Sequence, residues 1–275
     1  MVDIISMSDW VEAGRAGTLS VVMPAYNEEG CIEETVLSLA AALEAAAIQH
    51  EILVINDGST DGTKRLLLEI ETRLPTLRHI DNPPPNGFGL AVRRGLQEFR
   101  GDAVVIVMAD GSDAPEDIVA FYQKLEEGYD CVFGSRFIKG GKVIDDPPHK
   151  LFLNRLANNF IRLIFGLRYN DMTNACKCYR RHVIAGLQPI LAHHFNLTVE
   201  LPLKAIIRGY SYTWLPNSWH NRKFGVSKLK IREMGSRYLF IVLYCLIEKW
   251  LSRGDYSRQE MSPPAAATRP PSRSP

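Results

Sequence analysis

One stretch near the middle of the chain restricts the fold more than any other. Residues 104–108 read Val-Val-Ile-Val-Met, and Ala109-Asp110-Gly111-Ser112-Asp113 follows them directly. Such an apolar, β-branched run predicts a strand buried on both faces, as in the centre of a parallel sheet. Ligands of open α/β sheets bind beyond the carboxyl ends of these strands. We therefore expect Asp110 and Asp113 to face a polyanion bridged by a divalent cation; the alternative is that Asp110 caps a turn and Asp113 the next helix.

Segments with strand and helix patterns alternate along the first half of the chain. We expect strands at 19–23, 51–55, 77–80 and 130–136, and helices at 32–43, 66–70, 90–99 and 118–125. This alternation predicts an α/β fold with a mostly parallel central sheet and helices on both faces. Residues 1–17 show no periodic pattern and are expected to form a loose tail, and residues 140–149 a loop. Residues 254–275 are expected to form a disordered tail, because from Pro263 onward they are almost entirely Pro, Ala, Ser and Arg.

Composition limits the class of partner and the compartment. The chain has 32 basic and 31 acidic residues and a net charge of +1, so we expect no nucleic-acid partner. Its five cysteines are odd in number and scattered through apolar segments, which indicates reduced thiols and a cytoplasmic protein. No signal-peptide pattern is visible, and the apolar run 238–247 is shorter than the roughly 20 residues that a membrane span needs.

Two segments combine basic and large apolar side chains at helical spacing. They are residues 151–168 and 228–253, the first with Arg155, Arg162 and Arg168 set among Phe, Leu and Ile. Such segments either pack on the sheet or lie on a membrane surface. The presence of two of them favours peripheral association with a membrane.

Acidic and amide side chains follow three of the predicted strands. They are Asn27 and Glu28, then Asn56, Asp57 and Asp61, then Asp110 and Asp113. In a parallel sheet these strand ends share one edge, so the groups converge. Carboxylates in one place repel each other unless they bind a metal or hydrogen-bond a ligand. The combination suits a nucleotide-sugar, with ribose and base near Asp57 and the diphosphate reaching Asp110 through Mg²⁺ or Mn²⁺.

Several motifs, taken in order, carry a resemblance to a known family. They are Pro24-Ala25-Tyr26-Asn27-Glu28, Asn56-Asp57-Gly58-Ser59-Thr60-Asp61, Asn86-Gly87-Phe88-Gly89-x-Ala91, Ala109-Asp110, Gly134-Ser135-Arg136, Asp171-x-Thr173 and Arg222-x-x-Gly225-x-Ser227-Lys228. Their order and spacing resemble the family 2 inverting glycosyltransferases of GT-A fold. Within that family the chain is most similar to dolichol-phosphate mannose synthases and related bacterial polyprenyl-phosphate glycosyltransferases. The resemblance runs from about Leu19 to Lys230.

The resemblance implies transfer of mannose or a glucose-like sugar, with inversion, from a nucleotide-diphosphate sugar (GDP-mannose or a UDP-sugar) to a polyprenyl or dolichyl phosphate. It implies a GT-A catalytic domain over residues 18–227. The basic amphipathic pattern described above predicts an interfacial helix over 228–253. The catalytic residues that it implies are Asp110, Arg136 and Arg222. The implied substrate-binding residues are Pro24, Tyr26, Glu28, Asp57, Ala109, Ser135, Lys150 and Lys228. The implied metal ligand is Asp110, and we expect Asp113, one turn on, to be the second metal ligand.

The chain departs from the family pattern at several positions. Met108 stands where the family's Asp-x-Asp motif begins, and because a thioether is a poor ligand for Mg²⁺ or Mn²⁺, we expect Asp113 to supply the missing oxygen. Asn56 replaces the first of two paired aspartates. Lys150 and Asn154 replace an Arg and a Ser of the acceptor region, which keeps a positive charge but loses bidentate contact with phosphate.

Three other functions remain open on the sequence. A dinucleotide-binding oxidoreductase needs Gly-x-Gly-x-x-Gly after the first strand, whereas Gly87-Phe88-Gly89 follows the third and lacks the third glycine. A nucleotide-sugar binding protein that has lost catalysis is compatible with Met108. A GT-A transferase that acts on a soluble or growing glycan is the alternative within the enzyme class.

Overall fold

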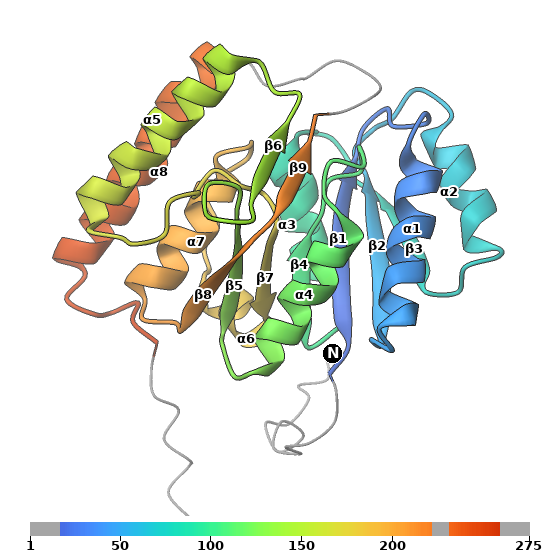
Figure 1. The fold of residues 1–275 in the computed structure, drawn as a ribbon, viewed down its shortest axis with the longest axis horizontal. Helices are drawn as coiled ribbons and strands as arrows, with labels where there is room; N and C mark the ends of the chain where they lie inside the picture. Colours follow the sequence, from blue (N-terminus) through green and yellow to red (C-terminus); the bar gives the residue numbers. More distant parts are fainter. Residues whose placement is uncertain (1–16, 222–230, 259–275) are drawn as a thin grey trace, which may run out of the picture.

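The computed structural model describes residues 17–221 and 231–258, with side chains from residue 235 onward in the last helix. A seven-stranded sheet, in the order β3-β2-β1-β4-β7-β5-β8, has helices on both faces, and a small sheet pairs β6 with β9 (Figure 1). The strands are β1 Leu19–Ala25, β2 His50–Asn56, β3 Leu77–Asp81, β4 Ala103–Ile106, β5 Cys131–Ser135, β6 Lys142–Ile144, β7 Lys177–Arg180, β8 Tyr212–Pro216 and β9 Ser218–His220. The helices are α1 Ile32–Ala45, α2 Thr63–Glu71, α3 Phe88–Glu98, α4 Pro115–Glu126, α5 Pro148–Phe165, α6 Arg181–Gly186, α7 Leu197–Ile207 and α8 Ile231–Leu251.

The large sheet is mostly parallel, as predicted. Strands β3, β2, β1 and β4 pair in parallel, and so do β5 and β8, whereas β7 is antiparallel to both β4 and β5. The carboxyl ends of β1, β2 and β4 therefore lie on one edge of the sheet.

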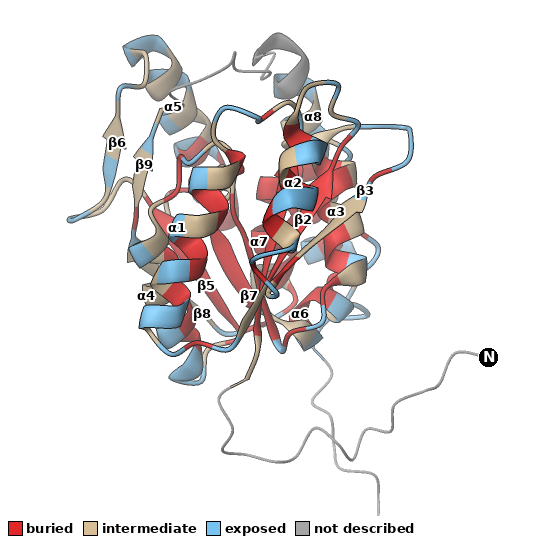
Figure 2. Cartoon of the chain, turned by 90° about the vertical axis from the view of Figure 1, so that its right-hand side faces the viewer, coloured by how far each residue is buried: buried red, intermediate tan, exposed pale blue. Residues whose placement is uncertain are grey.

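The central strands are buried on both faces, which explains their continuous apolar sequences. Every residue of β1 and of β4 is buried. Figure 2 shows the buried residues, in red, concentrated in the strands of the large sheet. Successive residues enter opposite cores: Val104 packs in the core with α3 and α5–α8, and Val105 in the core with α1, α2 and α4. An alternating pattern is absent because neither face of the strand meets water.

The structure corrects the predicted loop at 140–149. It contains β6, which pairs in parallel with β9, and α5 begins at Pro148. Five further elements, β7, α6, α7, β8 and β9, were not predicted from the sequence. The strands β7 and β9 are short, and α7 is buried on nearly all sides, including Glu200 and Lys204, so it has no amphipathic period to detect.

The last described residues pack on the fold. The backbone N–H of Arg258 donates to the Arg208 carbonyl oxygen at 2.7 Å, and its guanidinium lies 2.8 Å from a carboxylate oxygen of the buried Asp130. The prediction of disorder is therefore wrong for residues 254–258. No helix within the described residues is long and apolar enough to cross a membrane.

Candidate functional site

The loops after β1, β2 and β4 contact one another, which confirms the predicted convergence of the strand ends. The backbone N–H of Asn27 donates to Ser59 Oγ at 3.0 Å, and Asn27 Oδ1 accepts from the Thr60 backbone N–H at 2.7 Å. Cys31, which precedes α1, places its Sγ 3.5 Å from the Ala109 carbonyl oxygen. Three loops that are distant in sequence thus form one surface at the edge of the sheet.

Asp110 and Asp113 both lie in the loop after β4. Asp110 is half-buried, and its Oδ1 accepts from the Ser112 backbone N–H at 3.1 Å across a turn in which Gly111 has φ of +70°. Asp113 is buried, and its Oδ2 accepts from the Met108 backbone N–H at 3.0 Å. The N-cap of α4 is Ala114, without a side-chain bond, so the alternative that Asp113 caps this helix is wrong, whereas Asp110 does bridge a turn.

The oxygen atoms of this loop fit a hard divalent cation. Burial, with a further contribution from the nearby Asp110 charge, raises the pKa of Asp113 to about 7, and a bound cation would relieve this penalty. The buried Ser112 Oγ has no hydrogen-bond partner among the described residues. Among the described residues, no three His, Cys, Asp or Glu side chains are grouped so that they could hold a metal ion. Mg²⁺ is commonly bound by one or two carboxylates together with substrate phosphates, which is the donor set that Asp110 and Asp113 offer.

Asp57, at the end of β2, organises the loop that leads into α3. Its Oδ1 accepts from Asn82 Nδ2 at 2.7 Å and Asn86 Nδ2 at 3.2 Å, and its Oδ2 accepts from the Gly87 backbone N–H at 2.8 Å. The predicted donor-side carboxylate is therefore buried and fixes residues 82–87 in place. Beside it, Asn56 Nδ2 donates to Asp81 Oδ1 at 2.7 Å, a bond that an aspartate at position 56 would not make.

The connection between α6 and α7 packs against the first residues of α3, directly after this loop. The Phe88 ring stacks on Phe195 with centroids 4.2 Å apart. A Cβ on Gly89 would lie 2.5 Å from the His193 carbonyl carbon, so only glycine allows this approach. The Tyr238 hydroxyl of α8 donates to the Phe195 carbonyl oxygen at 3.4 Å. Sequence reasoning missed Phe195 because nothing in its local spacing connects it with Phe88.

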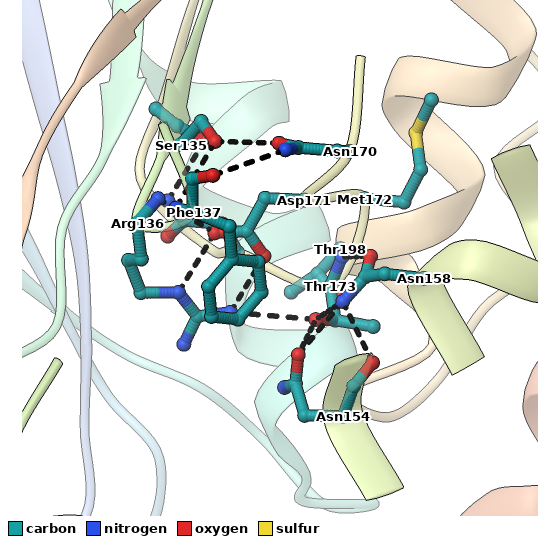
Figure 3. Close-up of polar contacts among 12 residues, drawn as sticks. Ser135, Arg136, Phe137, Asn154, Asn158, Asn170, Asp171, Met172, Thr173 and Thr198 are labelled. Atoms are coloured by element: carbon teal, nitrogen blue, oxygen red, sulfur yellow. Dashed lines mark hydrogen bonds and ion pairs between the residues drawn. The ribbon is translucent and has the colours of Figure 1, made fainter. Parts of the chain in front are cut away.

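A second polar group of residues lies where β5 ends. Arg136 donates from Nε at 2.8 Å and from Nη2 at 2.7 Å to the carboxylate of the fully buried Asp171, which also accepts from the Arg136 backbone N–H (Figure 3). Arg136 was predicted to clamp a phosphate, with a surface salt bridge as the alternative; the structure instead places it in a buried ion pair. Ser135 Oγ, also buried, donates to Asn170 Oδ1 at 2.7 Å.

Helix α5 and β7 complete this polar network. Asn154 and Asn158 of α5 both bond to Thr173, at 3.2 and 2.9 Å between their side-chain atoms (Figure 3). Lys177 of β7 is fully buried and donates from Nζ to three backbone carbonyls, those of Met172, Asn174 and Thr198. Burial lowers its pKa to about 7. Lys177 was not predicted from the sequence because β7, the strand that contains it, is only four residues long.

The remaining predicted residues have these positions. Lys150 is half-buried in the first turn of α5; burial raises the pKa of the nearby Asp146 carboxyl, against the opposing charges of Lys150 and Arg136. Pro24 and Ala109 are buried, Glu28 is buried with its N–H donating to Thr63 Oγ1 at 2.9 Å, and Tyr26 is exposed. Arg222 and Lys228 lie outside the described residues.

Comparisons with known proteins agree with this architecture. A family model described as glycosyl transferase family 2 matches residues 20–187. Polyprenol monophosphomannose synthase of Mycolicibacterium smegmatis is 32% identical over 76% of this chain and 80% of its own length. Dolichol-phosphate mannosyltransferase of Pyrococcus furiosus is 30% identical over 77% of this chain and 59% of its own length.

Among solved structures, glucosyl-3-phosphoglycerate synthase from Mycobacterium tuberculosis, in complex with Mn²⁺, UDP and phosphoglyceric acid, superposes with a TM-score of 0.62. It is 20% identical, and the match covers 85% of this chain and 78% of the other. At this identity the likeness concerns the fold, the predicted GT-A architecture.

Proposed function

This chain belongs to glycosyl transferase family 2, and we propose that it transfers a sugar, with inversion, from a nucleotide-diphosphate sugar to a polyprenyl phosphate at a membrane surface. One observation carries the acceptor part of the proposal. Helix α5 carries Lys150 in its first turn, bonds inward through Asn154 and Asn158, and exposes large apolar side chains on its outer face. An acceptor with a charged head and a hydrocarbon tail fits such a helix. The names of the two relatives in this family, a polyprenol monophosphomannose synthase and a dolichol-phosphate mannosyltransferase, agree with it.

On the donor side, the loops after β2 and β4 would receive the nucleotide and the diphosphate. Asp110 and Asp113 would hold Mg²⁺ or Mn²⁺, which neutralises charge on a leaving diphosphate when bound. Asp57 holds the 82–87 loop in place for the nucleotide. The donor is GDP-mannose or a UDP-sugar in this proposal.

On the acceptor side, the nucleophile is a phosphate oxygen that is already ionised at neutral pH. The protein therefore needs no strong base, and it acts by holding the phosphate in line with the anomeric carbon. Lys150 supplies positive charge at the start of α5, and Arg222 is expected to add to it from outside the described residues. Arg136, fixed by Asp171, holds its guanidinium in one orientation at the end of β5.

The membrane part of the proposal rests on two adjacent helices. Lys249 Nζ of α8 donates to the Phe165 carbonyl oxygen of α5 at 3.2 Å, so the two helices meet near their C-terminal ends (Figure 1). Each packs one side into the core, through Ile161 and Phe165 of α5 and through Ile241, Val242 and Cys245 of α8. Their other sides expose Phe152, Leu153, Leu156, Phe160 and Leu163, and Leu239, Phe240, Leu243, Ile247, Trp250 and Leu251. Leu163 is 77% exposed and Trp250 65%, which leaves an apolar surface suited to the headgroup region of a bilayer.

The transfer reaction is tested by incubating the purified chain with Mn²⁺ or Mg²⁺, GDP-mannose or UDP-glucose, and a short polyprenyl phosphate. We expect mass spectrometry to detect a polyprenyl-phosphate sugar with one of the donors, and chelation of the metal to stop its formation. Transfer only to soluble glycans would favour the alternative acceptor class. Donor binding without transfer to either acceptor would favour a binding protein.

Membrane association is tested by sedimentation with liposomes that contain anionic lipid. We expect binding that weakens as salt rises, and partial loss of binding when Phe240, Leu243 and Trp250 are changed together to Ser. The control is Leu68→Ser, which removes an exposed apolar side chain from α2, a helix on the opposite face of the sheet from α5 and α8. Equal binding by the triple variant and the control would contradict the assignment of this surface.

A further inference from the structure

Within the described residues, the end of β5 is short of positive charge for a phosphate ligand. The guanidinium of Arg136 is paired through two nitrogens with the carboxylate of Asp171, so the pair is close to neutral. The Asp146 carboxyl interacts electrostatically with Lys150 and Arg136, so it is a further acidic group near this site. A phosphate monoester carries a charge between about −1.5 and −2 near pH 7. Of the described residues assigned so far to the acceptor, Lys150 alone carries an unpaired positive charge here, and one charge does not balance the phosphate.

A second guanidinium lies beside this site and belongs to no motif. Arg155 of α5 places its Cζ 4.9 Å from the centroid of the Phe137 ring, and Arg136 places its Cζ 5.3 Å from the same centroid. Phe137 directly follows Arg136, and its ring lies beside the Arg136 guanidinium (Figure 3). Within the described part of the chain, Arg155 has this ring as its partner and no acidic side chain within ion-pair distance.

Arg155 also lies at a boundary on α5. Asn154, one residue before it, bonds inward to Thr173, while Phe152 and Leu156 on either side are among the exposed apolar residues of the helix. Arg155 itself is exposed. Its charge therefore stands between the polar network at the end of β5 and the apolar surface of α5, where the head of a lipid phosphate would lie.

We propose that Arg155 binds the phosphate of the acceptor, with the Phe137 ring as the platform that holds its guanidinium beside Arg136. This inference rests on the proposed function and assigns a substrate contact that the sequence motifs do not contain. A planar guanidinium on a ring keeps its N–H groups free at its edges, so it can donate two parallel hydrogen bonds to phosphate oxygens. Arg155 thereby supplies the bidentate contact that Lys150 and Asn154 cannot make.

The test compares Arg155→Gln with Arg162→Gln, which removes the same charge from an exposed arginine two turns further along α5. The acceptor is a short, water-soluble polyprenyl phosphate used without liposomes, so attraction to a membrane does not contribute. We expect Arg155→Gln to raise the acceptor KM about tenfold or more, the loss typical of one charge-assisted hydrogen bond, and to leave the donor KM and the Tm unchanged. Arg162→Gln should leave the acceptor KM unchanged.

Two further variants separate a direct contact from a structural one. Arg155→Lys should raise the acceptor KM by less than Arg155→Gln, because it keeps the positive charge but loses the two parallel N–H donors of the guanidinium. Phe137→Leu should raise the acceptor KM in the same direction, because the platform is lost.

Equal acceptor KM values for the two Gln variants, or a parallel rise of the donor KM, would overturn the proposal. So would an Arg155→Gln effect that appears only with liposomes, since that is general attraction to anionic lipid. A wild-type chain that transfers sugar to no phosphate acceptor would instead refute the proposed function, and this outcome is distinct from both.

Discussion

Removing one partner of the ion pair between Arg136 and Asp171 is expected to be one of the most destabilising single changes in this fold. Asp171 is completely buried, the Arg136 side chain is 11% exposed, and their charges meet at 2.7 Å. Asp171→Asn keeps the shape of the side chain but leaves a guanidinium in the interior without its counter-charge. Breaking a buried pair in this way costs about 3–5 kcal/mol, because the remaining charge keeps its desolvation penalty.

The control is Asp81→Asn, which breaks the pair between Asp81 and Lys64. Those side chains are 52% and 50% exposed, and an exposed pair is worth about 1 kcal/mol or less. The free energy of unfolding is measured by urea titration and checked by thermal denaturation, where a loss of 3–5 kcal/mol lowers the Tm by roughly 6–20 °C in a domain of this size.

A double variant completes the test. Arg136→Met with Asp171→Asn removes both charges, so it should be more stable than Asp171→Asn alone, although it loses more hydrogen bonds. If Asp171→Asn costs no more than Asp81→Asn, or if the double variant is the least stable of the set, the pair is hydrated and the reasoning is refuted.

Four further predictions concern the site and the interior. Asp110→Ala should abolish Mn²⁺-dependent transfer with an unchanged Tm, because a half-buried carboxylate supports little packing; near-normal turnover would place the metal elsewhere. Asp113→Asn, which keeps its hydrogen bond to the backbone, should lose metal-dependent activity, whereas an inactive Asp113→Ala beside an active Asp113→Asn would mark a purely structural role. Phe195→Ala should raise the donor KM and spare the acceptor KM in steady-state kinetics, because the stack on Phe88 holds the donor loop; the opposite split would contradict this. The pKa of Lys177 is lowered to about 7 from 10.5, so the unfolded chain binds more protons between these values and the free energy of unfolding should rise with pH across this window. Urea titrations from pH 7 to 10 should show this slope in the wild type and lose it in Lys177→Met; an unchanged slope would show that another group titrates.

The sequence by itself determined the parallel half of the fold. The apolar runs that became β1, β2 and β4, and the helices between them, follow from burial and periodicity, which are local properties of the chain. The order of connections then places their carboxyl ends on one edge, so the convergence of Asn27, Asp57 and Asp110 was also predictable.

Only the tertiary structure decided what several of these side chains do. Asp57 was expected to meet a nucleotide, and its oxygens hold a neighbouring loop; Arg136 was expected to face solvent or phosphate, and it is paired with Asp171 from another segment. The tertiary structure also set Phe195 against Phe88 and Arg155 against Phe137. A residue's neighbours in the sequence fix its secondary structure and its burial, but its hydrogen-bond partner is chosen by which loops the folded sheet and helices bring within about 3 Å of it. That choice depends on the packing of the whole domain, and no spacing in the sequence records it.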